Sequence, residues 1–234
     1  MIVPYAEIPS HADYEPKWSH VTKTSIYNCS HQAIWNLALV LKPKYMLDIG
    51  TWEGTSAMLM AHYLDDYEPA GHVVTVDVQT QTAFHERTHP LITQVQAYPH
   101  TMVGIREYPW AKPDVMRPDY ERGMTDSVVL NTQLILDALS AAGGDLFDFV
   151  YIDGDHSDIG LLRDLEIAKL TTRPPHYALL DDVFRPGVSA EKLYLEKLVH
   201  EYAHYDFDGD GWENFVESRG HVLGMPRMAL VWEK

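Results

Sequence analysis

The chain is poor in cysteine, in long apolar runs and in positive charge, and each shortage excludes a class of protein. Cys29 is the single cysteine, so no disulfide can form within the chain. No apolar run approaches the roughly 18 residues of a membrane-spanning helix, so we expect no membrane partner. Only 18 Lys and Arg face 34 Asp and Glu, a formal net charge of −16. Such a surface repels nucleic acid, so we expect no nucleic-acid partner either.

The beginning of the chain also lacks a targeting signal. Residues 1–10 contain no basic region followed by an apolar stretch, so we predict no signal peptide and a cytoplasmic location. The 234 residues, 46% of them hydrophobic, are enough for one large core. We therefore predict an N-terminal extension over residues 1–29 and a single domain over residues 30–234.

The order of the apolar segments indicates an α/β fold. Short apolar runs bounded by Gly and Pro alternate with stretches of helical periodicity, which favours a doubly wound, mostly parallel sheet covered by helices on both faces. We predict seven strands, the last two forming a C-terminal antiparallel hairpin. The predicted strands are 45–49, 72–78, 91–97, 147–152, 177–180, 222–223 and 228–232, and the helices are 30–41, one around 57–64, 130–141, 157–170 and 190–202.

Residues 98–127 do not fit this alternation. The segment contains four prolines and several aromatic residues, and a loop this long within a compact domain is usually functional or mobile. We interpret it as an insertion near the active site, with an oligomer contact or surface decoration as the alternative.

The strongest motif runs from Asp48 to Ser56, at the junction of the first predicted strand and a helix. Gly50 allows a tight turn and a close approach of the backbone to a ligand, and a helix N-terminus suits a polar ligand group. The spacing Asp-x-Gly-x-x-x-Gly differs from a dinucleotide fingerprint, which favours a cofactor without a pyrophosphate. Asp77 ends the next predicted strand, where a carboxylate can accept both ribose hydroxyls. The alternative is an ordinary turn with a capping Asp.

A second group of polar residues follows two later strands. Asp153, Asp155 and His156 follow one strand, and Asp181 and Asp182 follow the next. Carboxylates gathered at one sheet edge repel each other, and a divalent cation relieves that repulsion. Oxygen ligands suit Mg²⁺, with Mn²⁺ or Ca²⁺ as alternatives. His156 is suited to act as a base, although surface caps and turns explain the same residues.

The motif order resembles the class I S-adenosylmethionine-dependent methyltransferases, which have a Rossmann-like fold. The segments are Leu-Asp-Ile-Gly-Thr, Val-Thr-Val-Asp, Phe-Asp-Phe-Val-Tyr-Ile-Asp-Gly-Asp-His and Leu-Leu-Asp-Asp-Val, over roughly residues 30–200. They look closest to the branch of cephalosporin hydroxylase-like proteins and macrolide-sugar O-methyltransferases, with catechol O-methyltransferase more distant.

The resemblance implies a role for individual residues. It implies that S-adenosylmethionine contacts the loop after the first strand and that Asp77 binds its ribose. It also implies that Asp153, Asp181 and Asp182 hold Mg²⁺, although catechol O-methyltransferase has Asn where Asp182 stands and some relatives use no metal. The expected cofactor-binding residues are Asp48, Gly50, Thr51, Glu53, Gly54, Thr55, Ser56, Asp77 and Asp153, and the expected catalytic residues are Asp153 and His156.

Two further motifs compete for metal ions. His85-Glu86-Arg87-Thr88-His89 matches the His-Glu-x-x-His pattern of zinc peptidases, but Pro90 would end the helix that this site needs. Residues 206–217 match a calcium-binding loop at its ligand and glycine positions, but Glu213 stands where an apolar residue is usual and no room remains for an exiting helix. An acidic surface turn is the plainer interpretation.

The sequence therefore predicts an S-adenosylmethionine-dependent methyltransferase that uses a divalent metal to O-methylate a small molecule, such as a sugar or a natural product. A metal-free N- or C-methyltransferase and a non-catalytic scaffold with a degenerate cofactor pocket remain alternatives. A homo-oligomer is left open.

Overall fold

The structure is a computed structural model of the chain. It describes residues 34–35, 37–52, 54–78, 89–100, 126–155, 158–174, 176–181, 203–206 and 229–233; residues 158–159 and the last two ranges are described for the backbone alone.

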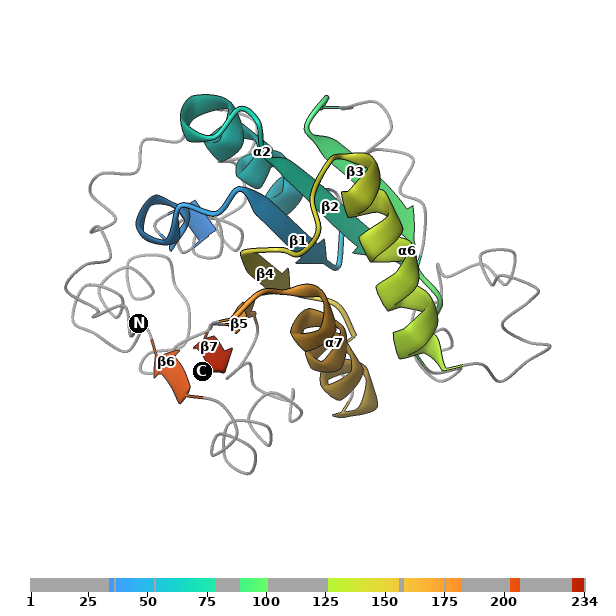
Figure 1. Cartoon of the computed structure of the whole chain (residues 1–234). Helices are drawn as coiled ribbons and strands as arrows, with labels where there is room; N and C mark the ends of the chain where they lie inside the picture. Colours follow the sequence, from blue (N-terminus) through green and yellow to red (C-terminus); the bar gives the residue numbers. More distant parts are fainter. Residues whose placement is uncertain are drawn as a thin grey trace.

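A twisted sheet forms the centre of the fold (Figure 1). Five strands run parallel in the order β3-β2-β1-β4-β5, and β7 then pairs antiparallel with both β5 and β6. The strands are β1 (Tyr45–Ile49), β2 (His72–Asp77), β3 (Ile92–Gln96), β4 (Phe149–Ile152), β5 (His176–Leu180), β6 (Ala203–Asp206) and β7 (Ala229–Glu233).

Helices cover both faces of the parallel strands, and each face has its own core. Alternate side chains of β1, β2, β4 and β5 point to one face, where they pack against α2 (Thr55–Tyr67) and the helical residues 37–41. The other side chains pack against α6 (Ser127–Ala141) and α7 (Asp158–Thr171). The strands are apolar in sequence because both of their faces are buried.

The predicted α/β fold with a mostly parallel sheet covered on both faces is confirmed. Several boundaries differ from the prediction by one to three residues, and two of the differences have a clear local cause. Helix α6 begins before residue 130 because the Asp126 carboxylate accepts a hydrogen bond from the Val128 N–H at 3.0 Å and so caps it. Strand β4 begins at Phe149, because Phe147 forms only an isolated bridge with Thr172.

Other predicted segments are described only in part. Only the two ends of the 98–127 segment are described, and the predicted helix 190–202 and strand 222–223 lie outside the described residues. The partner of β7 beyond β5 is β6, which we had not predicted as a strand. Within the described ranges, every helix is too short or too polar to span a bilayer.

The two-sided core gives a stability prediction. Phe149 in β4 is completely buried against the α2 face. We expect Phe149→Ala to lower the free energy of unfolding by about 3–5 kcal/mol, because it leaves a cavity that the packed sheet cannot close. Val129 on α6 is 61% exposed, so Val129→Ala should change it by less than about 0.5 kcal/mol. Urea unfolding followed by circular dichroism measures both values, and equal losses would contradict this packing.

Candidate functional site

Four chain segments that carry predicted site residues meet at one edge of the sheet. Gly50 follows β1, Asp77 ends β2, Asp153 follows β4 and Asp181 follows β5. Because these strands are parallel neighbours, their carboxyl ends lie side by side. Ligands of open α/β sheets bind beyond these ends, so this edge is the candidate site.

Gly50 lets the backbone after β1 pass very close to the backbone after β4. Its φ is +102°, and an added Cβ would lie 2.1 Å from the carbonyl oxygen of Asp153. The Gly50 N–H donates to the Val76 carbonyl at 2.9 Å, and the Asp153 N–H donates to the Ile49 carbonyl at 2.8 Å. The loop is therefore held from both neighbouring strands, and only glycine fits at its start.

The same loop turns directly into α2. Gly54 has a φ of +76° and occupies the N-cap position, and among the described residues no side chain caps this helix. The first turn of α2 therefore presents backbone N–H groups to the site edge, as the sequence predicted for the binding of a polar ligand. Thr55 begins the helix, whereas Glu53, another predicted contact, lies outside the described residues.

A buried chain of hydroxyls supports the loop from beneath. The Ser56 Oγ and the Thr75 Oγ1 donate to the two oxygens of the Asp48 carboxyl at 2.7 and 2.6 Å. Since the Thr75 proton is used for Asp48, Thr51 donates to the Thr75 Oγ1, 2.7 Å away. Asp48 is completely buried, so it can influence a ligand only by holding this loop in place.

Burial has a marked effect on the ionisation of Asp48. It raises the pKa of the Asp48 carboxyl to about 7, an effect that the hydroxyls of Thr75 and Ser56 reduce and the charge of Asp77 increases. Asp77 itself is half-buried, and its Oδ2 accepts a hydrogen bond from the Trp52 N–H at 3.0 Å. The loop after β1 is thus tied to the carboxylate that we expect to meet the ribose.

Asp153 and Asp181 lie around a hydroxyl that sequence reasoning missed. The buried Tyr151 hydroxyl donates to the Asp181 Oδ2 at 2.5 Å and lies 3.5 Å from the Asp153 Oδ2. The structure therefore brings two of the three predicted metal ligands together. Asp182 and the predicted base His156 lie outside the described residues. The sequence signal that could have indicated this contact is Tyr151 itself, a polar hydroxyl within the otherwise apolar strand β4.

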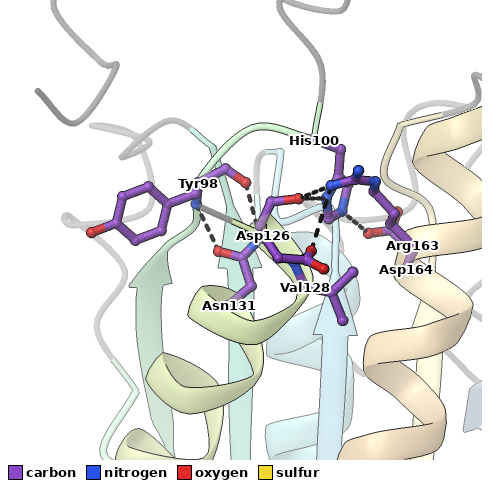
Figure 2. Close-up of polar contacts among 8 residues, drawn as sticks. Tyr98, His100, Asp126, Val128, Asn131, Arg163 and Asp164 are labelled. Atoms are coloured by element: carbon purple, nitrogen blue, oxygen red, sulfur yellow. Dashed lines mark hydrogen bonds and ion pairs between the residues drawn. The ribbon is translucent and has the colours of Figure 1, made fainter. Parts of the chain in front are cut away.

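A second polar network joins the ends of the 98–127 segment to the helices beside the site (Figure 2). The Asp164 Oδ1 on α7 lies 2.7 Å from the His100 Nε2, and the His100 Nδ1 lies 2.9 Å from the Ser127 Oγ. Arg163 donates to the same Ser127 oxygen at 2.6 Å. Asn131 bonds to both the N–H and the carbonyl of Tyr98. Both ends of the segment are therefore fixed near the site.

Asp164 also lies against the loop after β4. An added Cβ on Gly154, the residue after Asp153, would be 2.7 Å from the Asp164 Oδ2. Burial raises the pKa of the Asp164 carboxyl, whereas its contact with His100 lowers it. The pair links the 98–127 segment to the loop that carries Asp153. Sequence reasoning missed it because its members are far apart along the chain.

The two competing metal motifs are described only in part. Asp206 ends β6, and the remainder of the predicted calcium loop, residues 207–217, lies outside the described residues. Of the His-Glu-x-x-His motif only His89 is described, and its Nε2 lies 2.9 Å from the Asp65 Oδ2 on α2. Among the described residues, His89 lies before β3, away from the carboxyl edge of the parallel strands, whereas Asp206 is in register with Leu180 at the end of β5 through Ala229.

The close approach at Gly50 gives a second prediction. We expect Gly50→Ala to destabilise the fold by several kcal/mol and to abolish binding of S-adenosylhomocysteine, because the new methyl group overlaps the Asp153 carbonyl. Gly143 is a matched control: its φ is +82°, but nothing lies within 4 Å of an added Cβ. Gly143→Ala should cost only about 1 kcal/mol. Denaturant unfolding measures the stability of the two variants, and calorimetry measures their binding of S-adenosylhomocysteine. Equal losses in both variants would show that the close contact between Gly50 and Asp153 is not the cause.

The buried carboxyl gives a prediction for pH dependence. Since the pKa of Asp48 is raised above its value of 3.8 to about 7 in the folded state, its contribution to stability is complete below pH 4 and is lost as the pH rises through 7. The free energy of unfolding of the wild type should therefore fall relative to Asp48→Asn over this range, by roughly 4 kcal/mol.

Denaturant unfolding at a series of pH values measures that difference. Asp137→Asn, at an exposed position of α6, controls for the loss of one negative charge. If the free energy of unfolding of the wild type instead rises relative to that of Asp48→Asn as the pH increases, the prediction is wrong. The hydroxyls would then keep Asp48 ionised in the folded state.

Comparison with known proteins identifies the family. The model of a family described as "Methyltransferase domain" matches residues 47–183, which include most of β1, all of β2 to β5 and all four segments of the site edge. No curated protein matches the chain.

Solved structures share the fold at low sequence identity. The O-methyltransferase TomG from Streptomyces achromogenes, in complex with S-adenosylmethionine, is 17% identical with a TM-score of 0.52, over 88% of this chain and 79% of TomG. Cofactor-bound Rv0187 from MTB is 17% identical with a TM-score of 0.52, over 91% and 83% of the two chains. A protein assigned as a caffeoyl-CoA O-methyltransferase from Staphylococcus aureus is 14% identical with a TM-score of 0.51, over 88% and 83%.

The family model covers more than half of the chain, and the structural neighbours have the same fold. The chain therefore belongs to the methyltransferase-domain family and is a class I S-adenosylmethionine-dependent methyltransferase.

Proposed function

We propose that this methyltransferase transfers a methyl group to a hydroxyl oxygen of a small molecule, with the help of a divalent cation. The observation that carries the proposal is the meeting of Asp153 and Asp181 around the Tyr151 hydroxyl, at the same sheet edge as the loop after β1. The acidity of the chain and the scarcity of Lys and Arg support a small molecule over a nucleic acid as the acceptor.

The loop after β1 is the proposed cofactor site. We assign the contacts to residues 50–56, where the backbone of the loop and the first turn of α2 offer N–H groups to the methionine carboxylate. Asp77 is assigned to the ribose hydroxyls, and Asp153 lies beside the cofactor. Asp48 acts as a positioning residue, because its two oxygens hold Ser56 and Thr75 rather than facing the site edge.

The carboxylates after β4 and β5 suit a hard divalent cation. Asp181 is only 2% exposed and shares the Tyr151 hydroxyl with Asp153, so two carboxylates converge where water is scarce. An all-oxygen set of this kind fits Mg²⁺, and we assign Asp153, Asp181 and Asp182 as its ligands. A bound cation would lower the pKa of a substrate hydroxyl.

The chemistry requires a proton to leave. Methyl transfer forms a bond between the substrate oxygen and the methyl carbon and breaks the bond between that carbon and the sulfonium sulfur. The hydroxyl proton passes to a base, and we assign His156 to this role because imidazole accepts protons near neutral pH. The fold contributes mainly by holding donor and acceptor in line at the sheet edge.

One observation favours a metal-free reaction as the second candidate. The Tyr151 hydroxyl already donates to Asp181 and can stabilise the buried carboxylate without a cation. In that case Asp153 and Asp181 would orient the acceptor by hydrogen bonds alone, and transfer to nitrogen or carbon would be as suitable as transfer to oxygen.

The remaining parts of the chain complete the proposal. We propose that residues 30–234 form one domain after an extension over 1–29, and that the pairing of β7 with β5 and β6 completes a seven-stranded class I sheet. We propose that the 98–127 segment is an insertion near the active site, which is supported by the contact of His100 with Asp164 beside the loop after β4.

Titration of Mg²⁺ into the protein saturated with S-adenosylhomocysteine tests the metal. We expect Asp181→Asn to weaken Mg²⁺ binding by roughly tenfold or more, because changes to even the outer partners of a metal ligand cost about that much. Binding of S-adenosylhomocysteine should change by less than about threefold, since the residues assigned to the cofactor lie in the loop after β1 and at the ends of β2 and β4, whereas Asp181 follows β5. Asp137→Asn serves as the charge-matched control and should alter neither affinity.

Mg²⁺ binding by the wild type and by Tyr151→Phe distinguishes the metal-assisted from the metal-free reaction. If the site holds Mg²⁺, Tyr151→Phe should keep or strengthen its binding, because the substitution removes a hydroxyl that competes with the cation for Asp181. An absence of Mg²⁺ binding to the wild type, with intact binding of S-adenosylhomocysteine, would exclude the metal and favour the metal-free reaction. An absence of binding of S-adenosylhomocysteine itself would overturn the cofactor assignment.

A further inference from the structure

Two histidines and an aspartate meet on the surface, away from the candidate site. His62 and Asp65 lie three residues apart on α2 and so share one helix face, and His89 comes shortly before β3. The His89 Nε2 lies 2.9 Å from the Asp65 Oδ2, and the His62 Nδ1 lies 3.8 Å from the same oxygen. The two imidazole rings are 5.2 Å apart between centroids. These three residues form the His62–Asp65–His89 cluster.

The spacing of the three side chains suits a tetrahedral metal ion. One ligand atom from each residue lies within 4.8 Å of the other two. Bonds of about 2.0–2.2 Å to Zn²⁺ place neighbouring tetrahedral ligands roughly 3.3 Å apart. The distances of 2.9 and 3.8 Å from the Asp65 oxygen lie on either side of this value, so small rotations of the side chains are sufficient.

The chemistry of the ligands selects the type of cation. Two imidazole nitrogens and one carboxylate oxygen suit Zn²⁺, Ni²⁺ or Cu²⁺, whereas Mg²⁺ prefers oxygen alone. The side chains of His62 and Asp65 are 30% and 47% exposed and that of His89 is 12% exposed. Solvent can therefore reach the cluster and supply a fourth ligand, while His89 provides a more rigid anchor.

The position of the cluster separates it from methyl transfer. His62 and Asp65 lie about 10–15 Å along α2 from its first turn, which borders the cofactor loop. His89 precedes β3 and so belongs to the opposite edge of the sheet from Asp77, Asp153 and Asp181. A cation here would tie α2 to the segment that enters β3, and it would not meet the reacting groups.

We propose that the His62–Asp65–His89 cluster binds one Zn²⁺ or a similar transition-metal ion, with these three protein ligands and water as the fourth. The His-Glu-x-x-His motif of the sequence thus contributes His89 to a site whose other ligands come from α2. Metal binding costs one hydrogen bond. The His89 Nδ1 accepts from the Leu91 N–H at 3.2 Å, but coordination through Nε2 moves the ring proton to Nδ1, which can then no longer accept. That contact is long, so its loss leaves a site of moderate affinity.

Calorimetric titration of the full chain with Zn²⁺ tests the proposal. Millimolar Mg²⁺ in the buffer competes for the carboxylates proposed above, and the variants identify which residues hold the Zn²⁺. We expect one Zn²⁺ per chain in the wild type. His62→Ala, Asp65→Asn and His89→Gln should each weaken binding at least tenfold, and the visible absorption of Co²⁺ in the same site should decrease with them.

Controls separate loss of the site from loss of the fold. His176→Gln removes a histidine at the start of β5, and it should bind Zn²⁺ as the wild type does. Binding of S-adenosylhomocysteine should be unchanged in all the variants, which shows that they are folded. If His89→Gln does not fold, His62→Ala tests the site instead. His62 is the more exposed of the two histidines, so its replacement should disturb the fold less.

Two outcomes would overturn the proposal. Equal Zn²⁺ affinity in the wild type, His62→Ala and Asp65→Asn would show that the cluster is only a hydrogen-bonded link between α2 and the start of β3. Loss of binding in His85→Ala with retention in His62→Ala would place the ion at the His-Glu-x-x-His motif instead.

Discussion

The close contact between the backbone at Gly50 and the carbonyl of Asp153 governs the arrangement of the site. Strands β1 and β4 are neighbours at the centre of the sheet, and the chain leaves both at the same edge. Because no side chain fits between them, the loop after β1, where we propose that the cofactor binds, and the loop that carries Asp153 are packed directly against each other. The acceptor side and the cofactor side of a methyltransferase must adjoin in this way for in-line transfer.

Buried polar groups then fix the two sides of this contact. Asp48 is inaccessible to solvent, yet it determines the loop conformation through Thr75 and Ser56, one from the neighbouring strand and one from α2. On the other side, Tyr151 and Asp181 form a comparable buried bond. In a low-dielectric interior such bonds are stronger than in water, and each polar group left unpaired would be costly. The site is therefore rigid at its base.

The sequence allowed the parallel strands to be located with small errors, because a strand buried on both faces is continuously apolar. Two boundary errors have a local cause. Asp126 caps α6 and so starts this helix earlier than predicted, and Phe147 forms only an isolated bridge, so that β4 starts later than predicted. The site edge was also predictable, since Gly50, Asp77, Asp153 and Asp181 all stand at the ends of apolar runs. The contacts among Tyr151, His100 and Asp164 were not predictable, because their partners are remote along the chain.

The sequence by itself determined the alternation of strands and helices, the edge of the sheet that forms the candidate site and the residue types available there, because hydrophobic periodicity and strand-end motifs are local properties. Tertiary structure alone decided what each polar residue touches. It buried Asp48 against the hydroxyls of Ser56 and Thr75 beneath the loop after β1, and it set His89 beside Asp65 of α2. The physical reason is that hydrogen bonds and metal ligands depend on distances of a few ångströms, which only the packing of distant segments fixes.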